Sequence, residues 1–295
     1  MTQPTTPFAG KVALITGGTD GIGRAAALRL ARLGAHALIV GRSAAKGQAA
    51  ITALQGEPLP ESPGDSEFLP GCIEYVQADL SLMRGVQALA ETIRSRFERI
   101  DVLLHCAGVM RPRRTLTAEG LETVFAVQYV ARVHLTELLL DRLTPDSRII
   151  NVSAGGTLPL RLDFENLNGE KWYNGVYALM HESVANDLAL LRFIRTYPAL
   201  RFYAYGPFYV KTALFAEMPW WFNLMTGTFG RLMATTPDDA AEDITALVRS
   251  DRPSGMVSRN LKPIRPNAYR ADTARQDRLW NVTQALIERA VTGSS

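Results

Sequence analysis

Short apolar runs alternate with longer amphipathic stretches along most of the chain. Runs such as K-V-A-L-I-T are too short for buried helices and are typical of strands covered on both faces of a sheet. The longer stretches carry apolar residues at helical spacing. The predicted strands are Lys11–Thr16, Ala37–Val40, Ile73–Gln77, Ile100–His105, Arg148–Val152 and Leu200–Tyr205, and the predicted helices are Gly21–Leu33, Leu82–Phe97, Ala118–Leu143 and Val176–Thr196.

This alternation predicts an α/β fold: one Rossmann-type, doubly wound parallel sheet flanked by helices on both faces. We expect a single domain over residues 1–295, interrupted twice. Residues 55–71 are rich in Pro, Gly and acidic residues and predict a surface insertion. Residues 212–235 are apolar and contain M-P-W-W-F, so they predict a lid over an apolar ligand, a dimer contact or an interfacial membrane helix.

Composition narrows the possible partners. Of the 295 residues, 47% are hydrophobic and 21% charged, and the net charge of +3 comes from scattered Arg with no basic run, which argues against nucleic acid as a partner. No apolar run is long enough for a membrane span and no signal core is present, so a cytoplasmic protein is expected. The two cysteines and four histidines show no metal-ligand spacing, so no metal site is expected.

A glycine-rich segment, T-G-G-T-D-G-I-G over residues 16–23, joins the first predicted strand to the first predicted helix. Gly17, Gly21 and Gly23 allow a tight turn and a close approach of the backbone to a pyrophosphate. The N-terminus of the following helix offers unpaired N–H groups and a partial positive charge. This context favours dinucleotide binding over a purely structural turn.

The residue after the second strand indicates which dinucleotide is bound. An acidic side chain here would hold a ribose 2′-hydroxyl, as NAD requires. The sequence has Arg42 instead, and a guanidinium suits the 2′-phosphate of NADP(H). The alternative is a solvated Arg at a strand end.

Several motifs together resemble the short-chain dehydrogenases/reductases, in particular the retinol-dehydrogenase-like branch. Besides the glycine segment, these are A-D-L from Ala78, C-A-G from Cys106, F-A-V-Q-Y-V-A-R-V-H-L-T from Phe125, R-I-I-N-V-S from Arg148, N-G-E-K-W-Y-N from Asn168 and A-R-Q-D-R-L-W-N-V-T from Ala274. The resemblance implies NADP(H), carbonyl or alcohol chemistry on an apolar small molecule, and a homodimer or homotetramer. The cofactor contacts it implies are Gly17, Thr19, Asp20, Gly21, Ile22, Gly23, Arg42, Asp79, Leu80, Cys106, Ala107, Gly108 and Thr212.

The resemblance is weakest where that family has its Asn-Ser-Tyr-Lys tetrad. Without gaps, the four positions fall on Gln128, Ala154, Leu179 and Ser183. Gln128 keeps an amide, but Leu179 has no acidic proton and Ser183 has no positive charge. Ser153 lies one residue before Ala154, so on a strand it points to the opposite face.

A shifted register would use Tyr177 and His181, which are four residues apart and share a helix face. This pair precedes the aligned positions by two residues, a rotation of roughly 200° on a helix with about 3.6 residues per turn. Tyr177 and His181 would then point away from the nicotinamide. Phe208 also replaces a glycine of the branch, next to Tyr209.

Three functions remain open. The first is a repurposed enzyme of specialised metabolism that catalyses a redox-neutral cyclisation, isomerisation or cycloaddition on an apolar small molecule folded under Trp220–Phe222. Its candidate groups are Gln128, Ser153, Ser183 and Tyr209. The alternative is a divergent NADPH-dependent carbonyl reductase or alcohol dehydrogenase, with Tyr177 and His181 as candidates. A non-catalytic NADPH-binding scaffold is the third.

Overall fold

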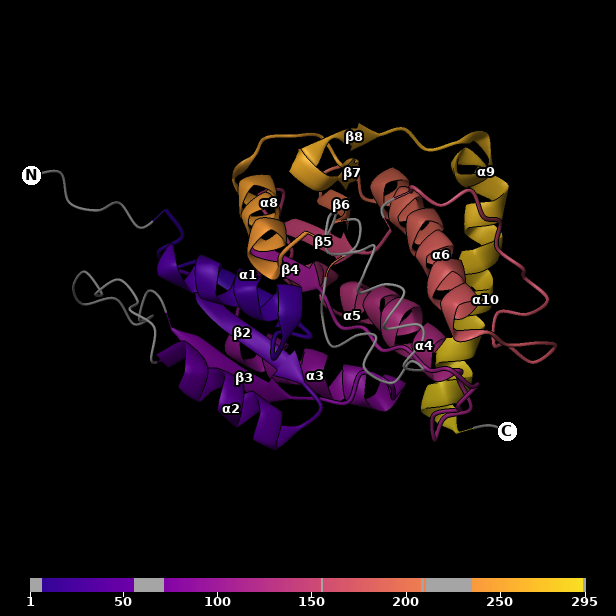
Figure 1. Cartoon of the computed structure of the whole chain (residues 1–295), viewed down its shortest axis with the longest axis horizontal. Coiled ribbons are helices and arrows are strands. Elements are labelled where there is room, and N and C mark those ends of the chain that lie inside the picture. The colour runs from indigo at the N-terminus through magenta and orange to yellow at the C-terminus, as the bar shows by residue number, and fades with distance from the viewer. Residues whose placement is uncertain (1–6, 56–71, 155, 208–209, 211–234, 294–295) are drawn as a thin grey trace, which may run out of the picture.

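One eight-stranded sheet runs through the computed structural model, which describes residues 7–55, 72–154, 156–207, 210 and 235–293 (Figure 1). The strand order is β3-β2-β1-β4-β5-β6-β7-β8, with β1 to β7 parallel and β8 antiparallel. The strands are β1 (Val12–Thr16), β2 (His36–Gly41), β3 (Ile73–Gln77), β4 (Val102–His105), β5 (Arg148–Val152), β6 (Arg201–Gly206), β7 (Gly255–Ser258) and β8 (Pro263–Ile264). The predicted Rossmann-type fold is confirmed.

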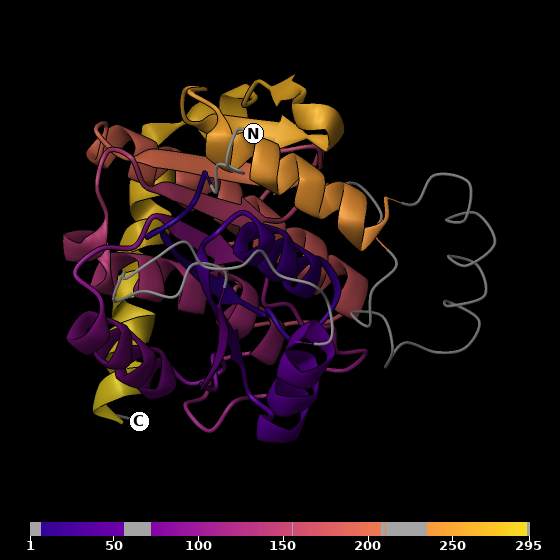
Figure 2. The same cartoon turned by 90° about the vertical axis from the view of Figure 1, so that its left-hand side faces the viewer.

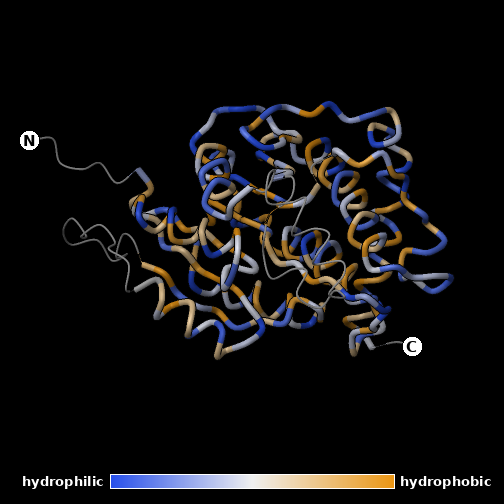
Figure 3. Tube along the Cα trace, viewed as in Figure 1, coloured by the Kyte–Doolittle hydropathy of each residue, from blue (hydrophilic) through white to orange (hydrophobic). Residues whose placement is uncertain are grey.

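Helices cover both faces of the sheet and build two apolar cores (Figures 1 and 2). On one face lie α1 (Gly21–Arg32), α2 (Ala44–Gln55) and α8 (Pro237–Arg249). On the other lie α3 (Met83–Arg96), α5 (Ala131–Leu138) and α6 (Gly175–Thr196), with α10 (Thr273–Thr292) packed against α6 and α3 and preceded by α9 (Ala268–Ala271). Burial on both sides explains why the central strands are continuously apolar, as the hydropathy colours along them show (Figure 3).

The predicted helix Ala118–Leu143 is wrong in extent. Gly120 has a left-handed φ of +77° in a turn, and Glu122 then caps the helix by accepting from the N–H groups of Val124 and Phe125. The segment comprises α4 (Thr123–Phe125), a π-helical turn η1 (Ala126–Val130), α5, and a 3₁₀ turn η2 (Leu140–Arg142). A π turn inside a helix is an unusual feature that often marks a functional position.

The strand order reverses between β1 and β4, because the chain first builds the sheet outward to β3 and then returns to the other side of β1. In such sheets the carboxyl ends of the strands at this point border a crevice. The predicted insertion and the predicted lid lie outside the described residues, apart from Gln55 and Thr235. The single domain therefore stays a prediction for the whole chain.

Candidate functional site

A cleft of about 420 Å³ lies at the carboxyl ends of β2, β1, β4 and β5, and we call it the central cleft. Residues at each of these strand ends line the cleft, together with residues of η1 and α5. The lining residues are Gly17, Thr19, Asp20, Gly21, Ile22, Gly23, Arg42, Lys46, Cys106, Gly108, Val109, Met110, Arg111, Gln128, Arg132 and Val152. Following the strand order, the end with Arg42 and Lys46 is the outer end, and the end with Gln128, Arg132 and Val152 is the inner end.

The middle of the central cleft is formed by the turn between β1 and α1. Gly17 has a φ of +68°, and a Cβ atom there would lie 2.6 Å from the Cα of Ala107. A Cβ on Gly23 would lie 2.4 Å from the carbonyl oxygen of Gly17. Asp20 caps α1 by accepting from the Gly21 N–H at 2.7 Å. The glycines therefore bring the backbone of this turn and the N-terminus of α1 to the surface of the cleft.

Two basic side chains define the outer end. Arg42 follows β2, and Lys46 lies one helical turn further on, in the first turn of α2. Both are exposed, and both line the central cleft. Lys46 was missed by the sequence analysis, although it follows Arg42 by only four residues.

The inner end combines an amide and a guanidinium, both buried. Gln128 lies in the π turn, and Arg132 follows it in α5. The Arg132 Nη1 and Nη2 atoms donate to the carbonyl oxygens of Val152 (2.9 Å) and Ala107 (3.0 Å), so the guanidinium bridges the ends of β5 and β4. Burial lowers the pKa of Arg132, and the nearby Glu182 opposes this effect.

Arg132 was also missed by the sequence analysis. It stands in the apolar stretch A-R-V-H-L, which gives no sign of a functional cation. Only the convergence of α5 with the ends of β4 and β5 brings the guanidinium to the cleft.

Three other predicted cofactor contacts in the described part of the chain, Asp79, Leu80 and Ala107, do not line the central cleft. Asp79 accepts from the N–H and the hydroxyl of Ser81, at 2.9 and 2.7 Å, and Leu80 is buried. Ala107 lies beneath the glycine turn, against Gly17. Thr212 lies outside the described residues, as do Phe208, Tyr209 and the predicted Trp220–Phe222 lid.

The aligned tetrad positions on α6 form their own contact. The Ser183 hydroxyl donates to the carbonyl oxygen of Leu179 at 3.1 Å, one turn earlier in the helix. Ser183 is buried, and neither residue lines the central cleft. At the end of β5 the Ser153 N–H donates to the Tyr205 carbonyl, and Ala154 follows it outside the cleft lining.

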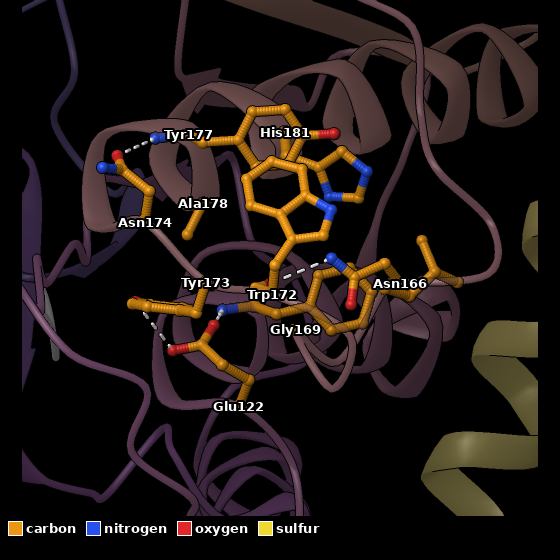
Figure 4. A pocket seen from close by; sticks show the side chains of 11 residues that line it. Glu122, Asn166, Gly169, Trp172, Tyr173, Asn174, Tyr177, Ala178 and His181 are labelled. Atoms are coloured by element: carbon orange, nitrogen blue, oxygen red, sulfur yellow. Dashed lines mark hydrogen bonds between the residues drawn. The ribbon is translucent and has the colours of Figure 1, made fainter.

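Tyr177 and His181 lie in a different pocket, beside Trp172 and Tyr173 (Figure 4). The Tyr177 ring stacks on His181 at 5.1 Å and contacts Trp172 at 4.2 Å between centroids. The pocket volume is about 20 Å³, room for little more than one water molecule. The packing explains the positions of Tyr177 and His181, and their catalytic role stays a prediction.

The ionisation of this pair differs from that of a Tyr–Lys pair. The Asp163 N–H donates to His181 Nε2 at 2.7 Å, and burial lowers the pKa of His181 to about 4, so its ring is neutral at pH 7. Burial raises the pKa of Tyr177. A neutral imidazole supplies no positive charge to lower the pKa of the phenol.

Other chemistry near the cleft is limited. Burial raises the pKa of the Cys106 thiol to about 12, so Cys106 is not a thiolate nucleophile at neutral pH. The described ranges contain no cluster of three metal-ligating side chains. They also contain no helix with the length and apolarity needed to cross a membrane.

A parallel sheet with a glycine turn at its switch point defines a Rossmann-type α/β protein. The sequence profile described as "short chain dehydrogenase" matches residues 11–160. Retinol dehydrogenase 12 of Bos taurus is 31% identical over 286 residues, which cover 94% of this chain and 86% of that protein. The chain therefore belongs to the short-chain dehydrogenase family, in its retinol-dehydrogenase-like branch.

Solved structures agree on the fold. A protein from Mycobacterium paratuberculosis matches with a TM-score of 0.72 and 26% identity, covering 95% of this chain and 94% of its own. The angucycline C-6 ketoreductase LanV, determined with bound NADP, matches with a TM-score of 0.61 and 24% identity over 83% of this chain and 90% of its own.

Proposed function

We propose that this chain binds NADP(H) in the central cleft and acts as an oxidoreductase on a small organic molecule at the inner end. The observation that carries this proposal is the convergence of three features in one cleft. These features are a glycine-rich turn whose backbone approaches its neighbours closely, the N-terminus of α1, and the basic pair Arg42 and Lys46. The bound cofactor would supply or accept a hydride.

The residues present fit such a cofactor. The N–H groups in the first turn of α1 suit a pyrophosphate, because they have no partner within the helix and the helix dipole favours an anion there. Arg42 and Lys46 suit the 2′-phosphate, since together they supply two positive charges and several donors at the outer end. The NADP-bound LanV structure supports the same choice of cofactor.

The substrate would lie at the inner end. Val109, Met110 and Val152 give this part of the cleft apolar lining, whereas Gln128 and Arg132 supply hydrogen-bond donors. Apolar walls with a few placed polar groups are typical of small-molecule sites. The retinol dehydrogenases and the ketoreductase among the relatives support alcohol or carbonyl chemistry.

A redox-neutral reaction on the same fold is the second candidate. It is favoured by α6, where Leu179 and Ser183 occupy the aligned Tyr and Lys positions and bond to each other. The cleft lining among the described residues includes no tyrosine, and its one lysine, Lys46, is at the outer end. Hydride transfer to a carbonyl would need another group to stabilise the developing oxyanion.

The test is to measure consumption of NADPH with a panel of apolar aldehydes and ketones, by the absorbance of the reduced nicotinamide. Steady consumption by the wild-type protein supports the oxidoreductase. The redox-neutral candidate is supported if the wild-type protein binds NADPH without consuming it and the Leu179→Tyr/Ser183→Lys variant gains NADPH-consuming activity. The Tyr177→Phe/His181→Ala variant should turn over like the wild type, because both residues line the other pocket.

The remaining predictions extend this proposal. A homodimer or homotetramer, a cytoplasmic location and an apolar substrate stay predictions. The non-catalytic scaffold also stays a prediction. It would be favoured if the protein bound NADPH but turned over no ligand.

A further inference from the structure

The inner end of the central cleft contains two buried donors that lack partners. Gln128 is 3% exposed and Arg132 is 5% exposed, and both line the cleft. The Gln128 Nε2 and Arg132 Nε atoms make no hydrogen bond within the described part of the chain. A buried donor without an acceptor is costly, so its presence in a folded protein calls for an explanation such as a ligand.

The backbone around these donors is held in place by α6. The Asn186 side-chain amide donates to the carbonyl oxygen of Gln128 at 2.8 Å, within the π turn. The same amide donates to the Glu182 carboxyl group at 2.6 Å. The backbone of Gln128 is therefore anchored, while its side-chain amide is left without a partner.

Arg132 is equally well positioned. Its two bonds to the carbonyl oxygens of Val152 and Ala107 fix the plane of the guanidinium and use two of its five N–H groups. Both donors are thus held before a ligand arrives. Such preorganisation lowers the entropic cost of binding.

Donors alone select the chemistry of the ligand. Neither the amide –NH₂ of Gln128 nor the guanidinium can accept a hydrogen bond, so both require an acceptor oxygen. Burial raises the pKa of Glu182 to about 8, which leaves this carboxyl group mostly neutral at pH 7. Glu182 therefore does not cancel the charge of Arg132, and the inner end favours an oxygen that carries negative charge.

We propose that Gln128 and Arg132 bind a carbonyl or carboxylate oxygen of the small-molecule substrate. This inference rests on the proposed function, because it places the substrate beside the cofactor. Leu179 and Ser183 on α6 do not contact the substrate oxygen in this proposal. Gln128 on η1 and Arg132 on α5 make that contact instead. In a carbonyl reduction they would stabilise the developing oxyanion.

The test measures the affinity of a carboxylate probe, 4-fluorobenzoate, for the full chain saturated with NADP⁺. Fluorine NMR detects the bound probe. Three variants are compared: Gln128→Met, Arg132→Lys and the control Gln276→Met. Gln276 is a buried glutamine of α10 that does not line the cleft, so its replacement controls for the loss of a buried amide. NADPH affinity is measured separately for each variant by nicotinamide fluorescence.

The proposal predicts that Gln128→Met and Arg132→Lys each weaken probe binding by about 10-fold or more, the effect of losing a hydrogen bond to a charged group. Gln276→Met should bind the probe like the wild type, and NADPH affinity should stay within about 3-fold throughout. Because Gln128 makes no side-chain bond in the described structure, its variant should fold even if Arg132→Lys does not.

Unchanged probe binding in Gln128→Met would overturn the proposal. An equal loss of NADPH affinity in the same variant would also overturn it, by assigning the donors to the nicotinamide carboxamide. Failure of the wild-type protein to bind NADPH would contradict the proposed function. The probe measurement, repeated without cofactor, would then show separately whether Gln128 and Arg132 bind an oxygen ligand.

Discussion

The inner end of the central cleft is built by different means from its middle and its outer end. The glycine turn and the N-terminus of α1 present backbone groups, and Arg42 and Lys46 come from one neighbouring strand end and the helix after it. The inner end instead depends on side chains from η1 and α5 that meet over β4 and β5. Backbone features persist as long as the fold does, whereas side chains at the inner end can change without disturbing it. Under the proposed function, the middle and the outer end of the cleft would hold the nucleotide, and the inner end would determine the reaction.

The glycine turn should give the largest effect. Gly23→Ala would place a Cβ atom 2.4 Å from the Gly17 carbonyl oxygen, so the turn must open. We expect NADPH affinity to fall by roughly 100-fold or more, measured by nicotinamide fluorescence. The control is Gly10→Ala, where the φ of +71° strains an alanine but a Cβ atom would meet open space, so it tests backbone strain without a steric clash. If both variants bind NADPH equally well, the close backbone approach is not what shapes the middle of the cleft.

The basic pair should control the choice of cofactor. Arg42→Ala removes a charged donor for the 2′-phosphate, so NADPH affinity should fall by about 10- to 100-fold while NADH affinity stays the same. Calorimetric titration with both nucleotides measures this difference. The control is Arg29→Ala, which removes a partly exposed arginine of α1 that pairs with Glu242 and does not line the cleft. A parallel loss for NADPH and NADH would mean that Arg42 does not contact the 2′-phosphate.

The unpaired amide of Gln128 should lower the stability of the ligand-free protein, although it contributes to ligand binding. Without ligand, Gln128→Met replaces an unpaired buried amide by an apolar side chain of similar size. We therefore expect the free energy of unfolding to rise by about 1–3 kcal/mol, measured by urea denaturation. Gln276→Met should gain less or lose stability, because it removes the Nε2 bond to the Arg270 carbonyl together with an unpaired Oε1. A destabilised Gln128→Met variant would show that the amide already has a partner.

Glu182 should make the inner end sensitive to pH. Its folded-state pKa, about 8, lies above the ordinary value of 4.5, so the folded protein holds a proton that the unfolded chain releases. The free energy of unfolding should therefore fall as pH rises between these values. In the wild type, relative to Glu182→Gln, we expect a loss of roughly 1–2 kcal/mol between pH 6.5 and 8. Denaturation at several pH values measures it, and parallel curves would contradict the assignment.

The range from pH 6.5 to 8 isolates Glu182 from its neighbours. Burial raises the pKa of Asp187 to about 6 and lowers the pKa of His181 to about 4, so both change charge in the folded protein below this range. The histidine contributions are the same in both proteins and cancel in the difference. Asp187 is mostly charged over this range, and its charge contributes to the raised pKa of Glu182.

The fold and the glycine turn in the middle of the cleft were the most predictable parts of the molecule. The alternation of short strand-like runs with helical stretches predicted Ile73–Gln77 and Arg148–Val152 with their observed bounds, although β3 is an edge strand with polar positions. The glycine turn is a local motif whose neighbours in sequence are also its neighbours in space. The helix start near residue 118 was missed because the turn at Gly120 and the cap at Glu122 lie within a pattern that still reads as helical.

The inner end was less predictable because it is assembled in space. Gln128 was found through its alignment with a known position, but Arg132 had no such guide. Its significance depends on where the ends of β4 and β5 meet α5, which no pattern in the sequence specifies. The aromatic packing of Tyr177 and His181 was likewise invisible, since Trp172 reaches them from the loop before α6.

The most direct test of the account is a nicotinamide fluorescence titration of the wild-type protein with NADPH and, separately, with NADH. The account predicts saturable binding of NADPH at least about 10-fold tighter than that of NADH, because Arg42 and Lys46 meet the 2′-phosphate. Equal affinities would contradict the assignment of the outer end. No binding of either nucleotide would contradict the central claim that this cleft holds NADP(H).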